Sequence, residues 1–524
     1  MQELKFEELT VKQKLGMVYA ATLSGTCSEE SKDFIKELIR NHSLGAIWIQ
    51  WDNPGTEELL AMVKEAADYP ILIITDAEAG IAEYKVGHHN AIGCTGSEEL
   101  AYAFGKTVGV TAKKMGYNVV CNPVLDIKTN GWTRSLGSDK YKLAALAAAE
   151  ARGMHDAGVL SCGKHYPSEV NFEDIDTHLA ESYSLQTKDE LLDYSLYAYL
   201  ELMKEDLLDG LMTAHCKCQK IDPNAPASLS KNVLDIIREQ GFDGFLITDA
   251  LCMMGIRAKY GDVESKGLAV EAGNDLALAY DGRTKFTYGA LCECYERGII
   301  SEERLDEAVR RVLAAQHKVM LMQNPKWTNL TCEDDKRFER INKDSVYVKI
   351  DAGLSHSLTR DGRHYFVLMV RNETTVGKEG GVAVDTFSNG WHYPAQITEK
   401  INELFPNSTV KIIYQFPTQG HMGSVVSQSI EYDDVIFLTF TECLAYTGKE
   451  HLTRRVVTLI EAMQRTGRIS AVVHFGNPKV LEELPHIPRY IFGGVSEKSV
   501  DTCLEVLAGE YEPKGVPTYE LNLK

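Results

Sequence analysis

The chain has 524 residues, of which 44% are hydrophobic and 25% are charged, a composition typical of globular proteins. A chain of this length predicts two or three domains, each large enough to bury its own core. With 75 acidic against 55 basic residues the formal net charge is -20, which disfavours nucleic acid and anionic membranes as partners.

The first five residues lack the basic and apolar segments of a secretory signal, and no apolar run has the length of a membrane span. We therefore expect a cytoplasmic protein whose 12 cysteines are reduced core residues. The fragment His215-Cys216-Lys217-Cys218 resembles part of a metal site. No second Cys or His pair stands at zinc spacing elsewhere in the sequence, so we predict neither a metal nor another cofactor.

Between residues 40 and 320, short apolar runs alternate with segments that carry apolar residues at helical spacing. This alternation indicates a parallel sheet whose two faces are covered by helices. Seven or eight such units over roughly 280 residues favour a (β/α)8 TIM-like barrel over an open doubly wound sheet. The predicted strands are 44–50, 70–75, 118–122, 159–163, 211–214, 244–248 and 276–279.

Polar residues gather just past the ends of these predicted strands, where the loops of a barrel converge on an active site. An Asp or Asn taken singly in such a place is often a helix N-cap, but Lys and His fit that role less well. We therefore predict a functional site at this end of the barrel. The residues are Asp76, Asp126, Lys164, His165, His215, Asp249 and Asn274-Asp275.

A charge-rich stretch around residues 333–344 is typical of a surface connector, and a second α/β pattern begins beyond it. This pattern predicts a smaller doubly wound α/β sandwich domain. We expect a barrel domain at 1–335, a linker at 336–350 and a C-terminal domain at 351–524. Its predicted strands are 365–370, 410–414, 435–440, 471–475 and 490–492, and its predicted helices are 394–404, 452–466 and 500–507.

Two segments of the predicted barrel carry the groups that a catalyst needs. Lys164-His165 is followed by Asp176-Thr177-His178, and a later apolar run ends abruptly in Asp249. A carboxylate at the end of one buried strand, facing a His/Asp pair on the loop after another, suits covalent catalysis at an acetal carbon. The carboxylate would be the nucleophile and the imidazole the proton carrier.

Several sequence blocks reinforce this interpretation because of the order in which they occur. They are 76–80, 122–126 with 134–137, 164–165, 212–215 with 226–230, 241–255 and 476–478. In this order they resemble glycoside hydrolase family 3, in particular its bacterial β-N-acetylhexosaminidase branch. The resemblance covers nearly the whole chain, since members often carry an α/β sandwich domain after the barrel.

The resemblance implies catalytic roles for three residues. Asp249 would form the covalent glycosyl intermediate. His178 would protonate the leaving oxygen and later deprotonate water, while Asp176 would orient the imidazole and raise its basicity. Glu169 and Glu173 are rival acids on the same loop, and Asp174, four residues before His178, is a less suited partner for the imidazole.

The resemblance also implies a sugar-binding group. Lys164 and His165 would hydrogen-bond hydroxyls of the non-reducing sugar, with Asp76 accepting from two of them and Arg134 bracing the same ring. His215 would line the pocket or cap the end of its strand.

These observations predict a metal-independent, retaining exo-glycosidase that releases terminal β-linked N-acetylglucosamine from a small saccharide or glycoside. A β-glucosidase of the same fold is one alternative. A β-N-acetylglucosaminide phosphorylase is another, because a neutral imidazole does not repel an incoming phosphate dianion as a carboxylate would. The non-enzyme alternative is an inactive sugar-binding protein. The aglycone and the oligomeric state stay open, with a homodimer as one option.

Overall fold

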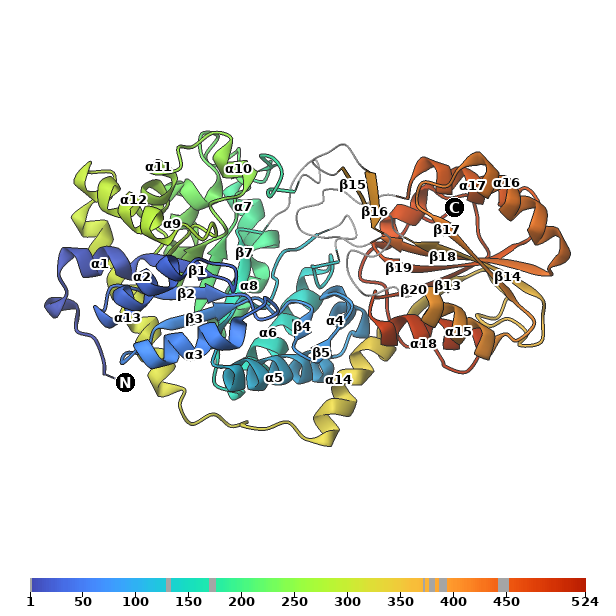
Figure 1. The fold of residues 1–524 in the computed structure, drawn as a ribbon, viewed down its shortest axis with the longest axis horizontal. Coiled ribbons are helices and arrows are strands. Elements are labelled where there is room, and N and C mark those ends of the chain that lie inside the picture. Colours follow the sequence, from blue (N-terminus) through green and yellow to red (C-terminus); the bar gives the residue numbers. More distant parts are fainter. Residues whose placement is uncertain are drawn as a thin grey trace.

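The computed structural model shows a barrel domain and a second, smaller α/β domain beside it (Figure 1). Within the residues that it describes, no helix combines the length and the apolar character needed to cross a membrane. The described residues are 2–128, 133–168, 176–370, 373–376, 382–385, 394–441 and 452–524.

Eight parallel strands form the first domain, and they follow one another around the sheet in chain order. The first strand pairs with the last, and a parallel bridge between Ile247 and Leu276 brings the seventh strand to the eighth. The sheet therefore closes into a barrel. Its strands are β1 (Tyr19–Leu23), β2 (Ala46–Ile49), β3 (Leu72–Thr75), β6 (Val119–Val120), β7 (Leu160–Tyr166), β9 (Gly210–Thr213), β11 (Phe245–Thr248) and β12 (Ala277–Leu278).

Helices before, between and after the strands cover the outside of the barrel. Several begin at a side chain that accepts a backbone N–H of the first turn, as Ser28, Ser97, Asp139 and Ser230 do. The helices are α1 (Val11–Met17), α2 (Glu29–Arg40), α3 (Thr56–Ala66), α5 (Glu98–Met115), α6 (Lys140–Asp156), α8 (Tyr197–Lys204), α9 (Lys231–Glu239), α11 (Glu264–Ala272) and α12 (Thr284–Glu296).

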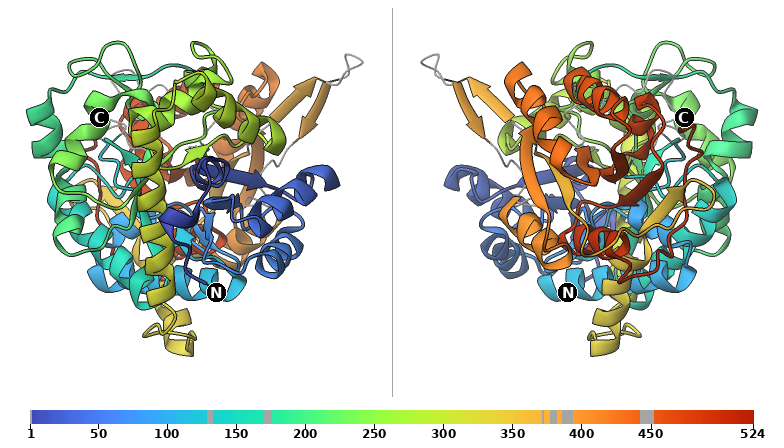
Figure 2. Two further views of the ribbon diagram at one scale, coloured as in Figure 1. Left: turned by 90° about the vertical axis from the view of Figure 1, so that its left-hand side faces the viewer. Right: turned by 90° about the vertical axis from the view of Figure 1, so that its right-hand side faces the viewer.

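The long helix α13 (Glu302–Leu321) covers the N-terminal end of the barrel (Figure 2, left). Its Val312, Ala315 and Val319 pack against the inward-facing side chains of the strands. Because this end is covered, the opposite end, where the strands finish, is the one at which loops can build a site.

Smaller helices and strands lie in the loops at the C-terminal end of the barrel. A hairpin follows β3, and a short parallel pair joins the loops after β7 and β9. These elements are β4 (Gly80–Ile81), β5 (Tyr84–Lys85), α4 (Asn90–Thr95), β8 (Tyr183–Ser184), α7 (Lys188–Glu190), β10 (Lys217–Cys218) and α10 (Met254–Arg257).

The charge-rich stretch that we expected to be a surface connector forms helix α14 (Cys332–Asp344). It begins at a capping box made by Thr331 and Asp334. Asp334 also pairs with Lys106 of α5 at 2.7 Å, and Phe338 is buried against the barrel. Most of the charges therefore mark the solvent face of a packed helix, while Asp334 and Asp344 are buried.

The second domain is a six-stranded sheet in the order β13-β20-β19-β18-β14-β17, parallel except for the pairing of β13 with β20. Helices α16 and α17 pack on one face, and α15 and α18 pack on the other (Figure 1). Its elements are β13 (Tyr347–Ile350), β14 (His364–Val370), α15 (Pro394–Leu404), β17 (Thr409–Tyr414), α16 (Gln419–Gln428), β18 (Asp434–Thr441), α17 (Arg454–Gln464), β19 (Ile469–Gly476), β20 (Arg489–Gly493) and α18 (Glu497–Ala508), with a hairpin of β15 (Glu373–Val376) and β16 (Val382–Asp385).

The predicted fold, a (β/α)8 barrel followed by a doubly wound α/β domain, is confirmed. The sequence did not reveal β1, β13 or α16. Only Val18 separates α1 from β1, so the apolar run of the strand merges with that of the helix. Strand β13 lies inside the predicted linker and joins the second sheet. The domain boundaries at 335 and 350 stay predictions.

Candidate active site

Two cations and two carboxylates meet at the mouth of the barrel. Lys164 on β7 pairs with Asp76, which follows β3, and with Glu78 at 2.6 Å. Arg134 donates from Nε and Nη2 to the two oxygens of Glu78 at 2.7 and 2.6 Å, a two-pronged arrangement that fixes both groups. The side chain of Asp76 is 35% exposed, whereas that of Lys164 is 1% exposed. Asp76 is therefore the member that a ligand can reach.

The opposite charges hold Lys164 and Glu78 of this cluster in their ionised forms, whereas burial raises the pKa of Asp76. Burial would raise the pKa of Glu78, but Arg134 and Lys164 hold it well below its ordinary value. Burial would likewise lower the pKa of Lys164, but Asp76 and Glu78 raise it. Lys164 and Glu78 are therefore charged at neutral pH.

A second carboxylate orients the neighbouring histidine. Nδ1 of His165 lies 2.7 Å from Oδ2 of the fully buried Asp126, which also accepts the backbone N–H of His165 at 3.2 Å. Nη2 of Arg134 lies 3.3 Å from Nε2 of the same ring. The ring of His165 is thus held between Asp126 and the cluster around Lys164.

Asp249 follows β11 directly and is fixed by one hydrogen bond of its backbone and one of its side chain. Its N–H donates to the carbonyl of Thr213 at 2.9 Å, and its Oδ1 accepts the N–H of Ala250 at 2.6 Å. Burial opposes the charge of Asp249, but the imidazoles of His165 and His215 and further contacts lower its pKa to about 2. The carboxylate is therefore ionised at neutral pH, as a nucleophile must be.

Asp176 and His178 form a hydrogen-bonded pair, which we call the dyad. Nδ1 of His178 lies 2.7 Å from Oδ1 of Asp176, which also accepts the backbone N–H of His178 at 2.9 Å. Burial would lower the pKa of His178, but the bond to Asp176 and the charge of Asp249 raise it. The charge of Asp249 thus acts on the ring of His178. The rival acids Glu169 and Glu173, and the alternative partner Asp174, lie outside the described residues.

The backbone of the dyad is held by helix α10, which follows Asp249 in the chain. The N–H groups of Met254 and Gly255 donate to the carbonyls of His178 and Thr177, each at 3.1 Å. A Cβ on Gly255 would lie 2.9 Å from the Thr177 oxygen, so glycine permits this close approach. The dyad and Asp249 therefore share one support.

His215 is fully buried next to the Asp249 segment. Its Nδ1 lies 2.7 Å from the hydroxyl of Ser228, and its Nε2 lies 3.0 Å from the carbonyl of Ala250. Because a carbonyl can only accept, Nε2 carries a hydrogen and braces the residue after the carboxylate. A direct contact of His215 with substrate stays a prediction.

The structure thus brings the eight residues that were given catalytic or sugar-binding roles to one end of the barrel. The prediction for Asn274-Asp275 is wrong in its placement, because the pair precedes β12 instead of following a strand. Asp275 is fully buried and paired with Arg238 and Arg304.

Sequence reasoning missed the part of Glu78, which pairs with both cations of the cluster. The available signal was its place two residues after Asp76 in a block already linked to sugar binding. It also missed the pairing of Asp126 with His165.

No group of three or more His, Cys, Asp or Glu side chains within the described ranges is arranged to hold a metal ion. Cys216 and Cys218, which resembled part of a metal site, are buried. The second of them belongs to β10, which pairs with β8 beside the dyad loop. The Cys-x-Cys fragment is part of this small sheet.

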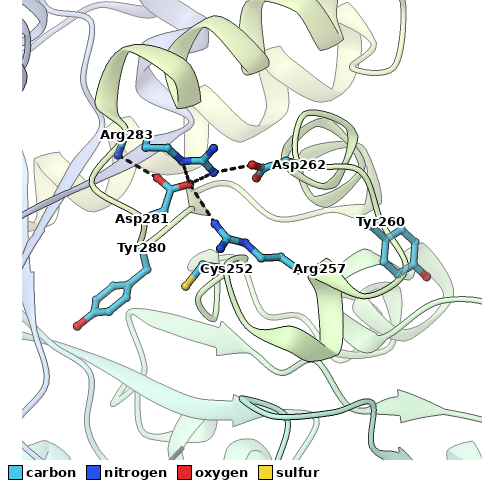
Figure 3. Close-up of a pocket in the computed structure, with 7 residues that line it drawn as sticks. All are labelled: Cys252, Arg257, Tyr260, Asp262, Tyr280, Asp281 and Arg283. Atoms are coloured by element: carbon cyan, nitrogen blue, oxygen red, sulfur yellow. Dashed lines mark hydrogen bonds and ion pairs between the residues drawn. The ribbon is translucent and has the colours of Figure 1, made fainter. Parts of the chain in front are cut away.

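A pocket of about 550 Å³ opens beside the Asp249 segment (Figure 3). In it, Arg257 and Arg283 both point toward Asp281. Tyr280 lines this pocket, and burial together with the charges of Asp76 and Asp249 raises its pKa to about 12. The lining residues are Cys252, Arg257, Tyr260, Asp262, Tyr280, Asp281 and Arg283.

A (β/α)8 barrel with carboxylates, cations and imidazoles at its mouth fits the chemistry of a glycoside hydrolase. The family profile described as the glycosyl hydrolase family 3 N terminal domain matches residues 3–315. The chain therefore belongs to glycosyl hydrolase family 3.

Individual relatives agree with this assignment. The chain is 31% identical to a β-hexosaminidase of Haemophilus influenzae over 243 residues, which are 43% of this chain and 68% of that protein. It is 25% identical to a β-N-acetylglucosaminidase/β-glucosidase of Cellulomonas fimi over 273 residues, 48% of each protein. The solved structure of a family 3 β-N-acetylglucosaminidase from Paenibacillus sp. is similar over 98% of this chain and 100% of its own, with a TM-score of 0.81 and 25% identity.

Proposed function

We propose that this glycosidase is a retaining exo-enzyme that releases terminal β-linked N-acetylglucosamine from small glycosides. The observation that carries the proposal is the dyad beside an ionised carboxylate. His178 has a raised pKa, and Asp249, whose charge contributes to raising it, has a pKa of about 2. One group therefore holds a proton and the other an electron pair at the same pH, as a double displacement requires.

In the first step, an oxygen of Asp249 attacks the anomeric carbon as the bond to the leaving oxygen breaks. His178 gives its proton to that oxygen, so the aglycone departs as a neutral alcohol. The product is a glycosyl ester of Asp249. Asp176 stabilises the imidazolium before transfer and keeps the ring in one orientation.

In the second step, the now neutral His178 removes a proton from water, whose oxygen attacks the same carbon. The ester bond breaks, Asp249 regains its charge and His178 regains its proton. Two inversions restore the β configuration. Lys164, Asp76 and Arg134 hold the sugar hydroxyls during both steps, which keeps the reacting atoms aligned.

The N-acetyl group enters the proposal through the relatives, several of which are named β-hexosaminidases. A panel of nitrophenyl β-glycosides tests it. We expect a higher kcat/KM for the 2-acetamido sugar than for glucose or xylose, because a site built around an amide leaves its own polar groups unpaired when the amide is absent. A preference for the glucoside would replace the proposal with a β-glucosidase.

Phosphorolysis is a second candidate, which the imidazole of His178 favours. A neutral His178 after the first step does not repel a phosphate dianion, whereas a carboxylate in its place would. The same panel with added inorganic phosphate separates the two reactions. Hydrolysis predicts the free sugar at every phosphate concentration, and phosphorolysis predicts the sugar 1-phosphate.

A further inference from the structure

The C-terminal tail of the chain returns from the second domain to the barrel. After α18, the N–H of Val516 donates to the carbonyl of Cys94 at 2.8 Å, at the end of α4. The carbonyl of Thr518 then accepts the N–H and the hydroxyl of Ser138, at 3.1 and 3.0 Å. Tyr519 is 4% exposed. The tail is therefore packed against the loop that carries Arg134.

Asn90 joins this tail to the backbone on both sides of Arg134. Its Nδ2 donates to the carbonyl of Ser135 at 2.7 Å and to the hydroxyl of Thr518 at 3.0 Å. Its own N–H donates to the carbonyl of Thr133 at 2.9 Å. Through its backbone N–H and its side-chain amide, the buried Asn90 thus fixes the residue before Arg134, the residue after it and the tail.

Two glycines let the tail approach so closely. A Cβ on Gly137 would lie 3.0 Å from Cβ of Thr518, and a Cβ on Gly93 would lie 3.1 Å from its methyl group. Gly137 also has a φ of 142°, which L side chains rarely adopt. The loop is therefore shaped around Thr518.

The other side of the loop rests on a buried pair within the barrel. Nδ1 of His89 lies 3.1 Å from the carbonyl of Arg134, and its Nε2 lies 2.8 Å from Oε2 of Glu150 on α6. Glu150 and His89 are 0% and 1% exposed. The segment that carries Arg134 is therefore held on one side by His89 of the barrel and on the other by the C-terminal tail.

We propose that Thr518 and Tyr519 are positioning residues for sugar binding, because they hold the segment 133–138 so that Arg134 meets Glu78 and the substrate. The tail contacts the segment that carries Arg134, so it acts on the sugar through that residue. This inference rests on the sugar-binding role proposed above for Arg134. It gives the second domain a part in the active site through the segment that carries Arg134.

Two truncated proteins that differ by two residues test this proposal. A chain that ends at Pro517 lacks Thr518 and Tyr519, whereas a chain that ends at Tyr519 keeps them and lacks only 520–524. The matched control still loses the partly buried Leu521 and Leu523, which pack on the second domain. A difference between the two truncations therefore reports on Thr518 and Tyr519.

Hydrogen exchange is the first measurement, because it does not depend on activity. The Ser138 amide loses its acceptor in the shorter chain, so peptides that span 133–140 should exchange faster there than in the longer chain. For a nitrophenyl substrate we expect KM to rise about tenfold in the shorter chain, with kcat changed by less than about threefold. A purely structural loss would lower the melting temperature without this KM-against-kcat split.

The outcomes distinguish a failure of this inference from a failure of the sugar-binding role proposed for Arg134. Equal exchange in both truncations would overturn the role of Thr518 and Tyr519. Faster exchange with an unchanged KM would contradict the sugar-binding role of Arg134 and the inference with it. Thr518→Val gives a milder check if the shorter chain fails to fold, since it removes the hydroxyl bonded to Asn90 and keeps the shape. We expect it to raise KM by about twofold to threefold, and an unchanged KM would count against the proposal.

Discussion

The two ends of the barrel both bury charges, but they use them differently. At the N-terminal end, Asp275 is fully buried and accepts from Arg238 at 2.8 Å, from Arg304 at 2.7 Å and from the N–H of Leu246 at 2.8 Å. At the C-terminal end, Asp76 pairs with Lys164 and yet remains 35% exposed. The first carboxylate is satisfied within the protein, whereas the second has room for a ligand.

This contrast separates stability from function within one fold. A fully paired buried carboxylate costs several kcal/mol when its charge is removed, because its partner cations stay buried without compensation. A carboxylate at the open end can be removed at a smaller structural cost, but the chemistry there depends on it. Removing a charge at the N-terminal end should therefore lower mainly the stability of the fold. Removing one at the C-terminal end should lower mainly the turnover.

The largest expected effect is that of Asp249→Asn at the open end. The amide keeps the size of the side chain but cannot form the ester, so turnover should fall by about a thousandfold or more. The melting temperature should change little. Steady-state rates with a nitrophenyl glycoside measure the first effect, and near-normal turnover would remove Asp249 from the mechanism.

His178→Ala tests the proton carrier at the same end. Substrates with poor leaving groups should lose about 10²- to 10⁴-fold in kcat, while activated phenolates, which depart without protonation, should be spared in the first step. The measurement is the dependence of kcat/KM on the pKa of the leaving group. Glu169→Gln and Glu173→Gln should leave this dependence unchanged. If Glu169→Gln alone showed the selective loss, the acid catalyst would be that carboxyl.

Asp275→Asn is the corresponding experiment at the N-terminal end of the barrel. It leaves Arg304 buried beside an amide, which should lower the free energy of unfolding by about 3–5 kcal/mol. The fraction that folds should keep its kcat, because Asp275 lies at the end away from the site. Denaturant unfolding and active-site titration measure the two quantities, and a loss of kcat in folded protein would break the comparison.

The smallest effect is a shift in pH dependence. With a poor leaving group, kcat/KM requires protonated His178 and ionised Asp249. The raised pKa of His178 keeps the imidazole protonated to higher pH, so activity should fall as pH rises through that pKa. Because the bond to Asp176 contributes to raising it, Asp176→Asn should move this alkaline limb to lower pH. An unmoved limb would show that another group controls it.

Much of the fold could be predicted because parallel strands that are buried on both faces appear as short apolar runs. The prediction failed where this signal was absent. In α14 only one face is apolar, and the charges of its solvent face gave it the composition of a connector. Strand β13 has one fully buried residue, Tyr347, so an edge strand of this kind leaves little trace in the sequence.

The members of the site were easier to predict than their interactions. Asp76 and Asp249 directly follow strands, and Lys164 lies near the end of β7, positions that the sequence largely reveals. That Glu78 joins Lys164 to Arg134 depends on segments 56 and 86 residues away meeting in space. The support of the Arg134 segment includes a contact between Asn90 and Thr518, which are 428 residues apart in the chain. Such contacts follow from the closure of the barrel and the docking of the second domain.

The central claim is that Asp249 becomes covalently attached to the sugar. Trapping with a 2- or 5-fluoro glycoside that carries a good leaving group tests it directly, because fluorine slows the second step and lets the ester accumulate. After digestion and mass spectrometry, we predict a single added glycosyl group on the peptide that contains Asp249, and none in Asp249→Asn. A labelled residue elsewhere, or turnover without any labelled peptide, would contradict the account.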